Sequence, residues 1–160
     1  MPVKYRQNDV FLIPVAGGKP AVGRVILKFG GGNILAVIYP GRPETVENVD
    51  FSYLKRARPV FTIETMDLSI KNGTWRVLGN WAPAVELPIP VYKTQFEFGG
   101  PFFEQFIDGS TGRQLADDEA SRLKKQKSYS PDLAEAAVRA LQGLGPWLPV
   151  FDEMRSDQTA

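Results

Sequence analysis

Residues 9–39, DVFLIPVAGGKPAVGRVILKFGGGNILAVIY, decide the fold of this 160-residue chain. Three apolar runs rich in β-branched and aromatic residues are separated here by two glycine-rich turns, a pattern typical of antiparallel strands. The runs are 9–15, 20–29 and 34–39, and the turns are 16–19 and 30–33. The first two runs predict a hairpin around Gly17-Gly18. The third is apolar almost throughout, which indicates a central strand or one buried on both faces.

The second run carries two further signals. Its alternation predicts that Val25, Leu27 and Phe29 share the buried face of the strand. Gly23 interrupts the run, and a glycine inside a strand indicates a bulge, a sharp bend or the close approach of another backbone.

The β character continues to about residue 107. Further strands are expected at 59–64, 75–81 and 102–107, because each is a short apolar run bounded by turn residues. The three prolines within 82–91 exclude a regular helix there and predict an extended crossing. Residues 94–98 alternate polar and apolar side chains.

Beyond residue 116 the composition becomes helical. Acids at 117–119 precede lysines at 124–127, the order that complements a helix macrodipole, so a helix is expected over 117–127. Ser130 as N-cap and Pro131 at the first helical position predict a second helix.

These elements together predict an α+β fold. A β-rich part over 9–107, either an antiparallel sheet or an SH3-like barrel, is followed by two C-terminal helices within 117–145. We expect one domain over 1–151 and a frayed polar tail over 152–160.

The chain contains no histidine and no cysteine. That absence excludes disulfides, thiolate or imidazole metal sites, cysteine nucleophiles and the Ser-His-Asp triad. We expect neither a metal nor a cofactor. The N-terminus lacks the apolar segment of a secretory signal, and the longest apolar runs are strand-sized, so a cytoplasmic protein without a membrane span is expected.

The net charge of +1 conceals an asymmetry. Residues 1–58 contain nine basic and four acidic side chains, a net charge of +5, whereas the remainder contains ten basic and fourteen acidic ones, a net charge of −4. With a pI of about 7.9 the totals do not favour nucleic-acid binding. The basic clusters at 55–58 and 124–127 are interpreted as solvated surface.

Glycine clusters at 17–18, 30–32 and 99–100 are candidates for phosphate-binding loops. A phosphate-binding loop leads into a helix N-terminus. The first two clusters lead into expected strands, so hairpin turns are the preferred interpretation and no nucleotide is predicted.

Paired carboxylates are the remaining route to hydrolysis without histidine. The candidates are Glu64 with Asp67, Glu104 with Asp108, and the run Asp117-Asp118-Glu119. A solvated acidic face is the alternative for each, and helix capping accounts for the last.

Segments spread from about residue 9 to about residue 142 carry, in order, the motifs of one known family. They are 9–14 with 18–25, then 75–80 with Pro83 and 90–93, then Leu123-Lys124 and Tyr129-Ser130-Pro131 ahead of an amphipathic helix. Together they resemble the immunity protein 26 family of bacterial polymorphic toxin systems. Asn8 stands where a glycine often precedes the aspartate in that family.

The resemblance implies a small cytoplasmic protein that binds a cognate toxin and neutralises it without catalysis, as a monomer or weak dimer. The family's motif residues are expected to be structural rather than partner-binding: Gly23, Trp75, Gly79, Asn80, Ser130 and Pro131.

Many toxins of such systems are nucleases with basic clefts, for which an acidic patch is a natural complement. The densest acidic group in the chain is the candidate toxin-binding surface: Glu104, Asp108, Asp117, Asp118 and Glu119. Two other classes stay open from the residues alone, a small binding module for RNA or a peptide, and a carboxylate-based hydrolase.

Overall fold

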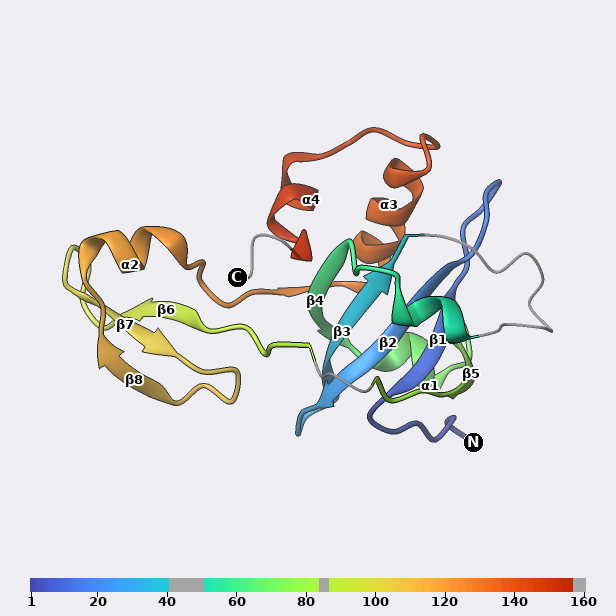
Figure 1. Ribbon diagram of the computed structural model, residues 1–160, viewed down its shortest axis with the longest axis horizontal. Helices are drawn as coiled ribbons and strands as arrows, with labels where there is room; N and C mark the ends of the chain where they lie inside the picture. Colours follow the sequence, from blue (N-terminus) through green and yellow to red (C-terminus); the bar gives the residue numbers. More distant parts are fainter. Residues whose placement is uncertain (41–50, 84–86, 157–160) are drawn as a thin grey trace.

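The computed structural model describes residues 1–40, 51–83 and 87–156 and has two β-sheets and short helices (Figure 1). The strands are β1 (Asp9–Ile13), β2 (Ala21–Lys28), β3 (Asn33–Tyr39), β4 (Phe61–Met66), β5 (Arg76–Asn80), β6 (Tyr92–Gln95), β7 (Phe102–Gln105), β8 (Thr111–Gln114) and β9 (Ser128–Tyr129). The helices are the 3₁₀ turn η1 (Phe51–Lys55), α1 (Leu68–Lys71), α2 (Asp117–Arg122), α3 (Pro131–Leu141) and α4 (Pro149–Glu153). The predicted α+β fold is confirmed.

The main sheet has the strand order β5-β1-β2-β3-β4-β9. Its pairs are antiparallel except β4 with β9, and β1 and β2 form the predicted hairpin. In that order β5 and β9 lie at opposite edges, so this part of the chain forms an open sheet, not a barrel.

Both faces of the main sheet are buried, which explains the nearly continuous apolar sequence of β3. On one face α3 and α4 pack over Phe11, Ile38 and Phe61 (Figure 1). On the other face η1 and the segment after β5 cover Leu35 and Val37. The central position predicted for 34–39 is therefore confirmed.

Gly23 makes room for an aromatic ring from the neighbouring strand. It lies opposite Phe11 in the β1–β2 register, and a Cβ at position 23 would come within 2.4 Å of the Phe11 ring. Phe11 in turn stacks on Trp75 with ring centroids 5.3 Å apart. The expected close approach is present, but a side chain makes it, not a backbone.

The shared face expected for Val25, Leu27 and Phe29 is wrong. The register of β2 with β3 shifts between Val25 and Leu27, which marks a β-bulge. Because one extra residue reverses the alternation, Val25 packs in the core beneath α3, whereas Leu27 and Phe29 pack on the opposite face.

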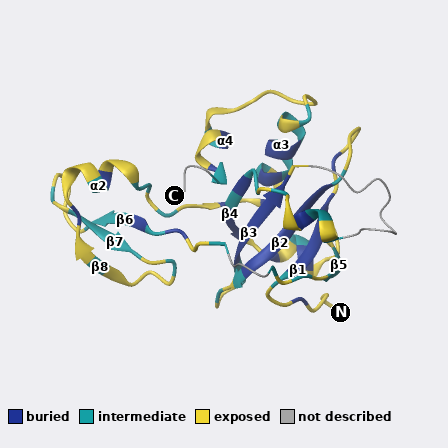
Figure 2. Ribbon diagram, viewed as in Figure 1, coloured by how far each residue is buried: buried dark blue, intermediate teal, exposed yellow. Residues whose placement is uncertain are grey.

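A second, three-stranded sheet was not predicted from the sequence. Strands β6, β7 and β8 pair in that order and carry α2, and we call residues 92–122 the arm. The arm lies beside the main sheet, and most of it is exposed or half-buried (Figures 1 and 2). Tyr92, Leu115 and Ala120 form its few buried positions.

The helix expected over 117–127 ends at Arg122, which corrects that prediction. Leu123 is already extended, with φ of −102° and ψ of 150°. The chain then continues to β9, which adds a parallel strand to the edge of β4. Within the segment between α2 and β9, the Lys124 carbonyl accepts a hydrogen bond from the backbone N–H of Lys93 at 3.1 Å, a partner outside the helix.

Of the two predictions for the C-terminal part of the chain, the helix start is confirmed and the frayed tail is wrong. Ser130 Oγ accepts a hydrogen bond from the backbone N–H of Leu133 at 3.2 Å and Pro131 is the first residue of α3, so the predicted helix start is confirmed. The expectation of a frayed tail is wrong for 152–156. Met154 is fully buried and Arg155 forms a β-bridge with Phe61, while residues 157–160 lie outside the described part.

Asn8 has a positive φ of 68°, the left-handed region in which glycine and asparagine are favoured. This conformation explains why an asparagine replaces the glycine that often stands here in the resembled family.

Candidate functional site

All five acidic residues of the candidate toxin-binding surface lie in or directly beside the arm's strands and helix. Glu104 is in β7, Asp108 is in the β7–β8 turn, and Asp117, Asp118 and Glu119 form the first turn of α2. All five acids therefore belong to the arm, although they lie at different places on it.

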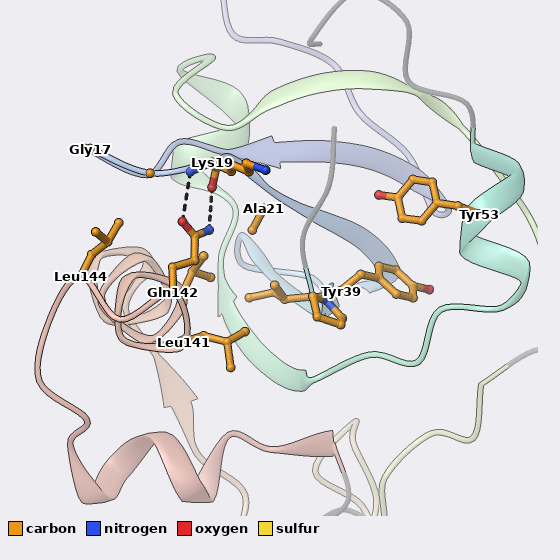
Figure 3. Close-up of a pocket in the computed structure, with 12 residues that line it drawn as sticks. Gly17, Lys19, Ala21, Tyr39, Tyr53, Leu141, Gln142 and Leu144 are labelled. Atoms are coloured by element: carbon orange, nitrogen blue, oxygen red, sulfur yellow. Dashed lines mark hydrogen bonds between the residues drawn. The ribbon is translucent and has the colours of Figure 1, made fainter. Parts of the chain in front are cut away.

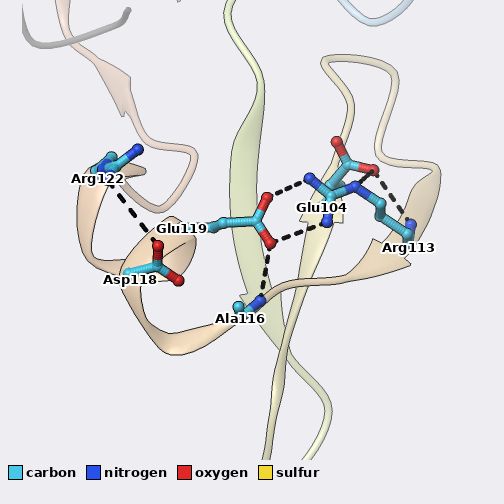
Figure 4. A network of polar contacts seen from close by, with 6 residues as sticks. All are labelled: Glu104, Arg113, Ala116, Asp118, Glu119 and Arg122. Atoms are coloured by element: carbon cyan, nitrogen blue, oxygen red, sulfur yellow. Dashed lines mark hydrogen bonds and ion pairs between the residues drawn. The ribbon is translucent and has the colours of Figure 1, made fainter.

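Arg113 in β8 holds two of these carboxylates together (Figure 4). Its guanidinium pairs with both oxygens of Glu119, at 3.0 Å for the Nη1–Oε1 contact, and its Nε lies 3.7 Å from Glu104 Oε1. Glu119 also accepts a hydrogen bond from the backbone N–H of Ala116 at 3.1 Å, which caps α2. The bond to Arg113 is the main cause that lowers the pKa of Glu119 to about 2. Two of the five acids are therefore engaged in holding the arm together.

The other three acids do not converge. Asp118 lies 4.0 Å from Arg122 one turn along α2, and both side chains are exposed. Asp117 is exposed at the helix start. Asp108 bonds the hydroxyl and amide of Ser110, which lowers its pKa. Because β8 runs from the Asp108 turn to α2, Asp108 sits one strand length away from Asp117 and Asp118.

Sequence reasoning missed two aromatic residues in the turn between β6 and β7. Phe96 is 67% exposed and Phe98 is fully exposed. Phe96 also contacts Phe103 of β7, with ring centroids 5.1 Å apart. The alternation over 94–98 contained the signal, but alternation alone is typical of a strand with a buried apolar face, whereas the strand ends at Gln95. Exposed aromatic residues of this kind are typical of interaction hot spots.

The arm and the segment after it carry basic side chains as well. A cavity of about 380 Å³ is lined mainly by basic side chains, with one acidic side chain, Glu153, among its described lining residues. The basic residues are Lys93, Arg122, Lys124, Lys125 and Lys127. Lys127 pairs with Glu153 at 3.2 Å, and burial lowers the pKa of Lys124. Residues 92–127 contain six basic and six acidic side chains, so this unit presents both signs of charge.

The carboxylate pairs considered for hydrolysis are separated by their own partners. Asp67 accepts from the Tyr5 hydroxyl at 2.6 Å and pairs with Lys71 at 3.0 Å, whereas Glu64 accepts from the Gln126 amide. Glu104 pairs with Arg113, and Asp108 bonds Ser110. A cavity of about 410 Å³ holds Lys93 and Glu97, but Glu97 is the one carboxylate among its described lining residues, and this chemistry needs two.

Glu64 is a buried carboxylate where the arm meets the main sheet, and it supports a pH-dependent prediction. It is 7% exposed, and desolvation raises its pKa above the ordinary value of 4.5, although the Gln126 amide partly opposes this. Because the folded state then binds the proton more tightly than the unfolded state, ionised Glu64 destabilises the fold as pH rises above 4.5.

We expect Glu64→Gln to raise stability at pH 7 by about 1 kcal/mol, a Tm increase of about 2–4 °C, and to give no gain below about pH 4. Thermal unfolding over a pH range of about 4 to 8 measures this, with exposed Glu97→Gln as the matched control. A gain that persists at the acid end of that range contradicts the assignment.

The glycine turn at 17–18 closes onto the end of α3. The Gln142 side chain accepts from the Lys19 backbone N–H at 3.0 Å and donates to the Lys19 carbonyl at 2.6 Å (Figure 3). A cavity of about 870 Å³ lies beside these two hydrogen bonds, and Leu141 and Leu144 line it. Since Gly17 and Gly18 join two strands, the hairpin-turn interpretation is confirmed.

Among residues 1–40, 51–83 and 87–156, no helix has the length and hydropathy needed to cross a membrane. The same described residues contain no group of three or more acidic side chains arranged to hold a metal ion.

The family model described as Immunity protein 26 matches residues 7–103, more than half of the chain. The chain belongs to the immunity protein 26 family. Comparisons with curated proteins and with solved structures gave no match. In this immunity protein 26 family member the matched segment contains β1 to β6 and the start of β7. It ends before Glu104, the first of the five candidate acids.

Proposed function

We propose that this protein is a non-catalytic immunity protein that binds a cognate toxin domain through the arm and thereby neutralises it. The observation that carries the proposal is the pair Phe96 and Phe98, two large aromatic side chains held in solvent by a tight turn. Water-exposed rings of this size are unfavourable in a free protein and become favourable when a partner covers them.

Three features support the arm as the contact element. It belongs to an immunity protein family member, it exposes much of its surface (Figure 2), and it carries both the exposed pair Phe96 and Phe98 and the five candidate acids. The protein would act in the cytoplasm of the bacterium that produces the toxin.

Asp117 and Asp118 are the acids best placed to meet a basic toxin surface. Both are exposed, and Asp118 pairs with Arg122 rather than with Arg113 (Figure 4). Charges of this kind mainly accelerate association and set its salt dependence.

The test measures binding to the toxin domain encoded beside this gene, by calorimetry and surface plasmon resonance at two salt concentrations. We expect Phe96→Ser with Phe98→Ser to weaken binding about 100-fold or more, mainly through faster dissociation. We expect Asp117→Lys with Asp118→Lys to slow association about tenfold and to flatten its salt dependence.

Leu68→Ser is the matched control, because Leu68 is also an exposed apolar residue (59%) but lies in α1 on the main sheet. It should bind like the unmodified protein. If the double phenylalanine variant stays folded and binds the toxin with unchanged affinity, the arm is not the contact element. If the unmodified protein neither binds the toxin nor blocks its activity, the proposed function is wrong.

A further inference from the structure

Arg24 in β2 is a buried cation without a buried counter-charge among the described residues. It is 2% exposed, and within that part of the chain its guanidinium bonds only neutral acceptors. Nη1 donates to Asn8 Oδ1 at 2.9 Å, and Nε donates to the Tyr39 hydroxyl oxygen at 3.3 Å. Asp9, a buried acid on the neighbouring strand, is engaged instead by the backbone N–H of Arg6 and the amide of Asn80.

Such an arrangement is unusual because an arginine cannot discharge itself by losing a proton. Buried charges in proteins are normally paired with an opposite charge, since desolvation is costly. Two hydrogen bonds also leave several of the five N–H donors of Arg24 without a protein acceptor among the described residues.

Arg24 lines a cavity of about 530 Å³, a size typical of small-ligand sites. The guanidinium carbon lies 5.4 Å from the centroid of the Trp81 ring, and Leu54 and Leu87 add apolar wall. The charged residues among the described lining are Arg24 and the exposed Lys55, both cations. The cavity therefore combines a positive interior with an aromatic and aliphatic surround.

The Tyr39 hydroxyl next to Arg24 adds to this imbalance. It accepts from Arg24 Nε and still carries a donor proton of its own. Among the described residues, Arg24 and Tyr39 therefore offer more hydrogen-bond donors than the neighbouring side chains offer acceptors.

We propose that this cavity binds a carboxylate carried on a flat apolar body, with the carboxylate paired to Arg24 and the apolar body against Trp81. A carboxylate has only acceptors and matches the guanidinium fork in two parallel hydrogen bonds. The apolar walls suit an aromatic or aliphatic body better than the hydrated charge of a phosphate. The carboxylate comes either from a free organic acid or from a toxin side chain, and only the second source rests on the proposed function.

Benzoate and benzamide are the probes, because they differ in charge but hardly in shape. Two-dimensional NMR of the Arg24 Nε–H and the Trp81 indole N–H, assigned with Arg24→Met and Trp81→Phe, reports occupancy at matched ionic strength. We expect benzoate to shift both signals and benzamide to shift neither. Arg24→Met should lower benzoate affinity about 10- to 100-fold.

Equal shifts with benzamide, or unchanged benzoate affinity in Arg24→Met, overturn the proposal. If Arg24→Met does not fold, the Trp81 indole signal, which is assigned with Trp81→Phe, still compares benzoate with benzamide in the unmodified protein. Lys55→Ala then serves as a second variant, expected to weaken benzoate only slightly because Lys55 is exposed.

Toxin binding measured with and without saturating benzoate distinguishes the two sources. Competition identifies the carboxylate as the toxin's, and unchanged toxin affinity identifies it as that of a free acid. If the protein binds no toxin at all, the proposed function fails while the benzoate result stands by itself.

Discussion

Replacement of Trp75 by alanine is expected to lower the free energy of unfolding by about 3–5 kcal/mol. Trp75 is fully buried, stacks on Phe11, and donates its indole N–H to Glu135 Oε1 at 2.9 Å. It thereby ties the segment before β5 both to β1 and to α3. The substitution removes the largest fully buried side chain, leaves a cavity between sheet and helix, and leaves Glu135 without its indole donor.

Urea denaturation followed by circular dichroism measures this loss. Trp75→Phe deletes the N–H and part of the buried ring but keeps an aromatic ring against Phe11, so a smaller loss than for Trp75→Ala is expected, of which about 1 kcal/mol comes from the hydrogen bond. Phe98→Ala is the matched control and should change stability by less than about 0.5 kcal/mol, since Phe98 is fully exposed. A loss below about 1 kcal/mol for Trp75→Ala would contradict this packing.

Gly23→Val is the second substitution with a large expected effect, a destabilisation of about 3 kcal/mol. A Cβ at this position would lie 2.4 Å from the Phe11 ring, and that ring is fully buried and stacks on Trp75. The clash therefore has to be relieved by moving packed side chains or the β1–β2 pair itself.

A double-mutant cycle with Phe11→Leu tests this cause directly. The leucine side chain is smaller than the phenylalanine ring at the contact point, so we expect Gly23→Val to cost clearly less in that background than in the unmodified protein. Gly30→Ala is the control glycine substitution, because a Cβ there would meet no atom within 4 Å. Additive effects of the two changes in the cycle would show that Phe11 is not the obstacle.

The elements predicted correctly are those whose sequence signal is local. The β1–β2 hairpin follows from two strand-forming runs around Gly17-Gly18, and α3 follows from Ser130 and Pro131 at its start. Each signal acts within a few residues, through strand propensity, turn geometry or a cap. The arm lacked such a signal, because β6 and β8 have four residues each and mixed composition, and they become strands only by pairing with β7.

Local signals were also insufficient to predict the geometry of the candidate site. Proximity in sequence placed Glu104 and Glu119 on one unit, but only the paired strands bring Arg113 between them. The exposure of Phe96 and Phe98 depends on where β6 ends and the turn begins. Arg24 has the sequence context of an ordinary alternating residue of β2, and its burial depends on segments far along the chain, η1 and Trp81.

Short-range patterns in the amino-acid sequence were sufficient for the α+β class, the first hairpin, the start of α3 and the resemblance to an immunity protein family. Long-range packing was needed for the β-bulge that turns Leu27 and Phe29 to the other face, the end of α2 at Arg122 and the buried Met154. The same packing determines which charges are neutralised and which stay unpaired. Those outcomes are set by the free energy of contacts between distant segments, which local propensities do not contain.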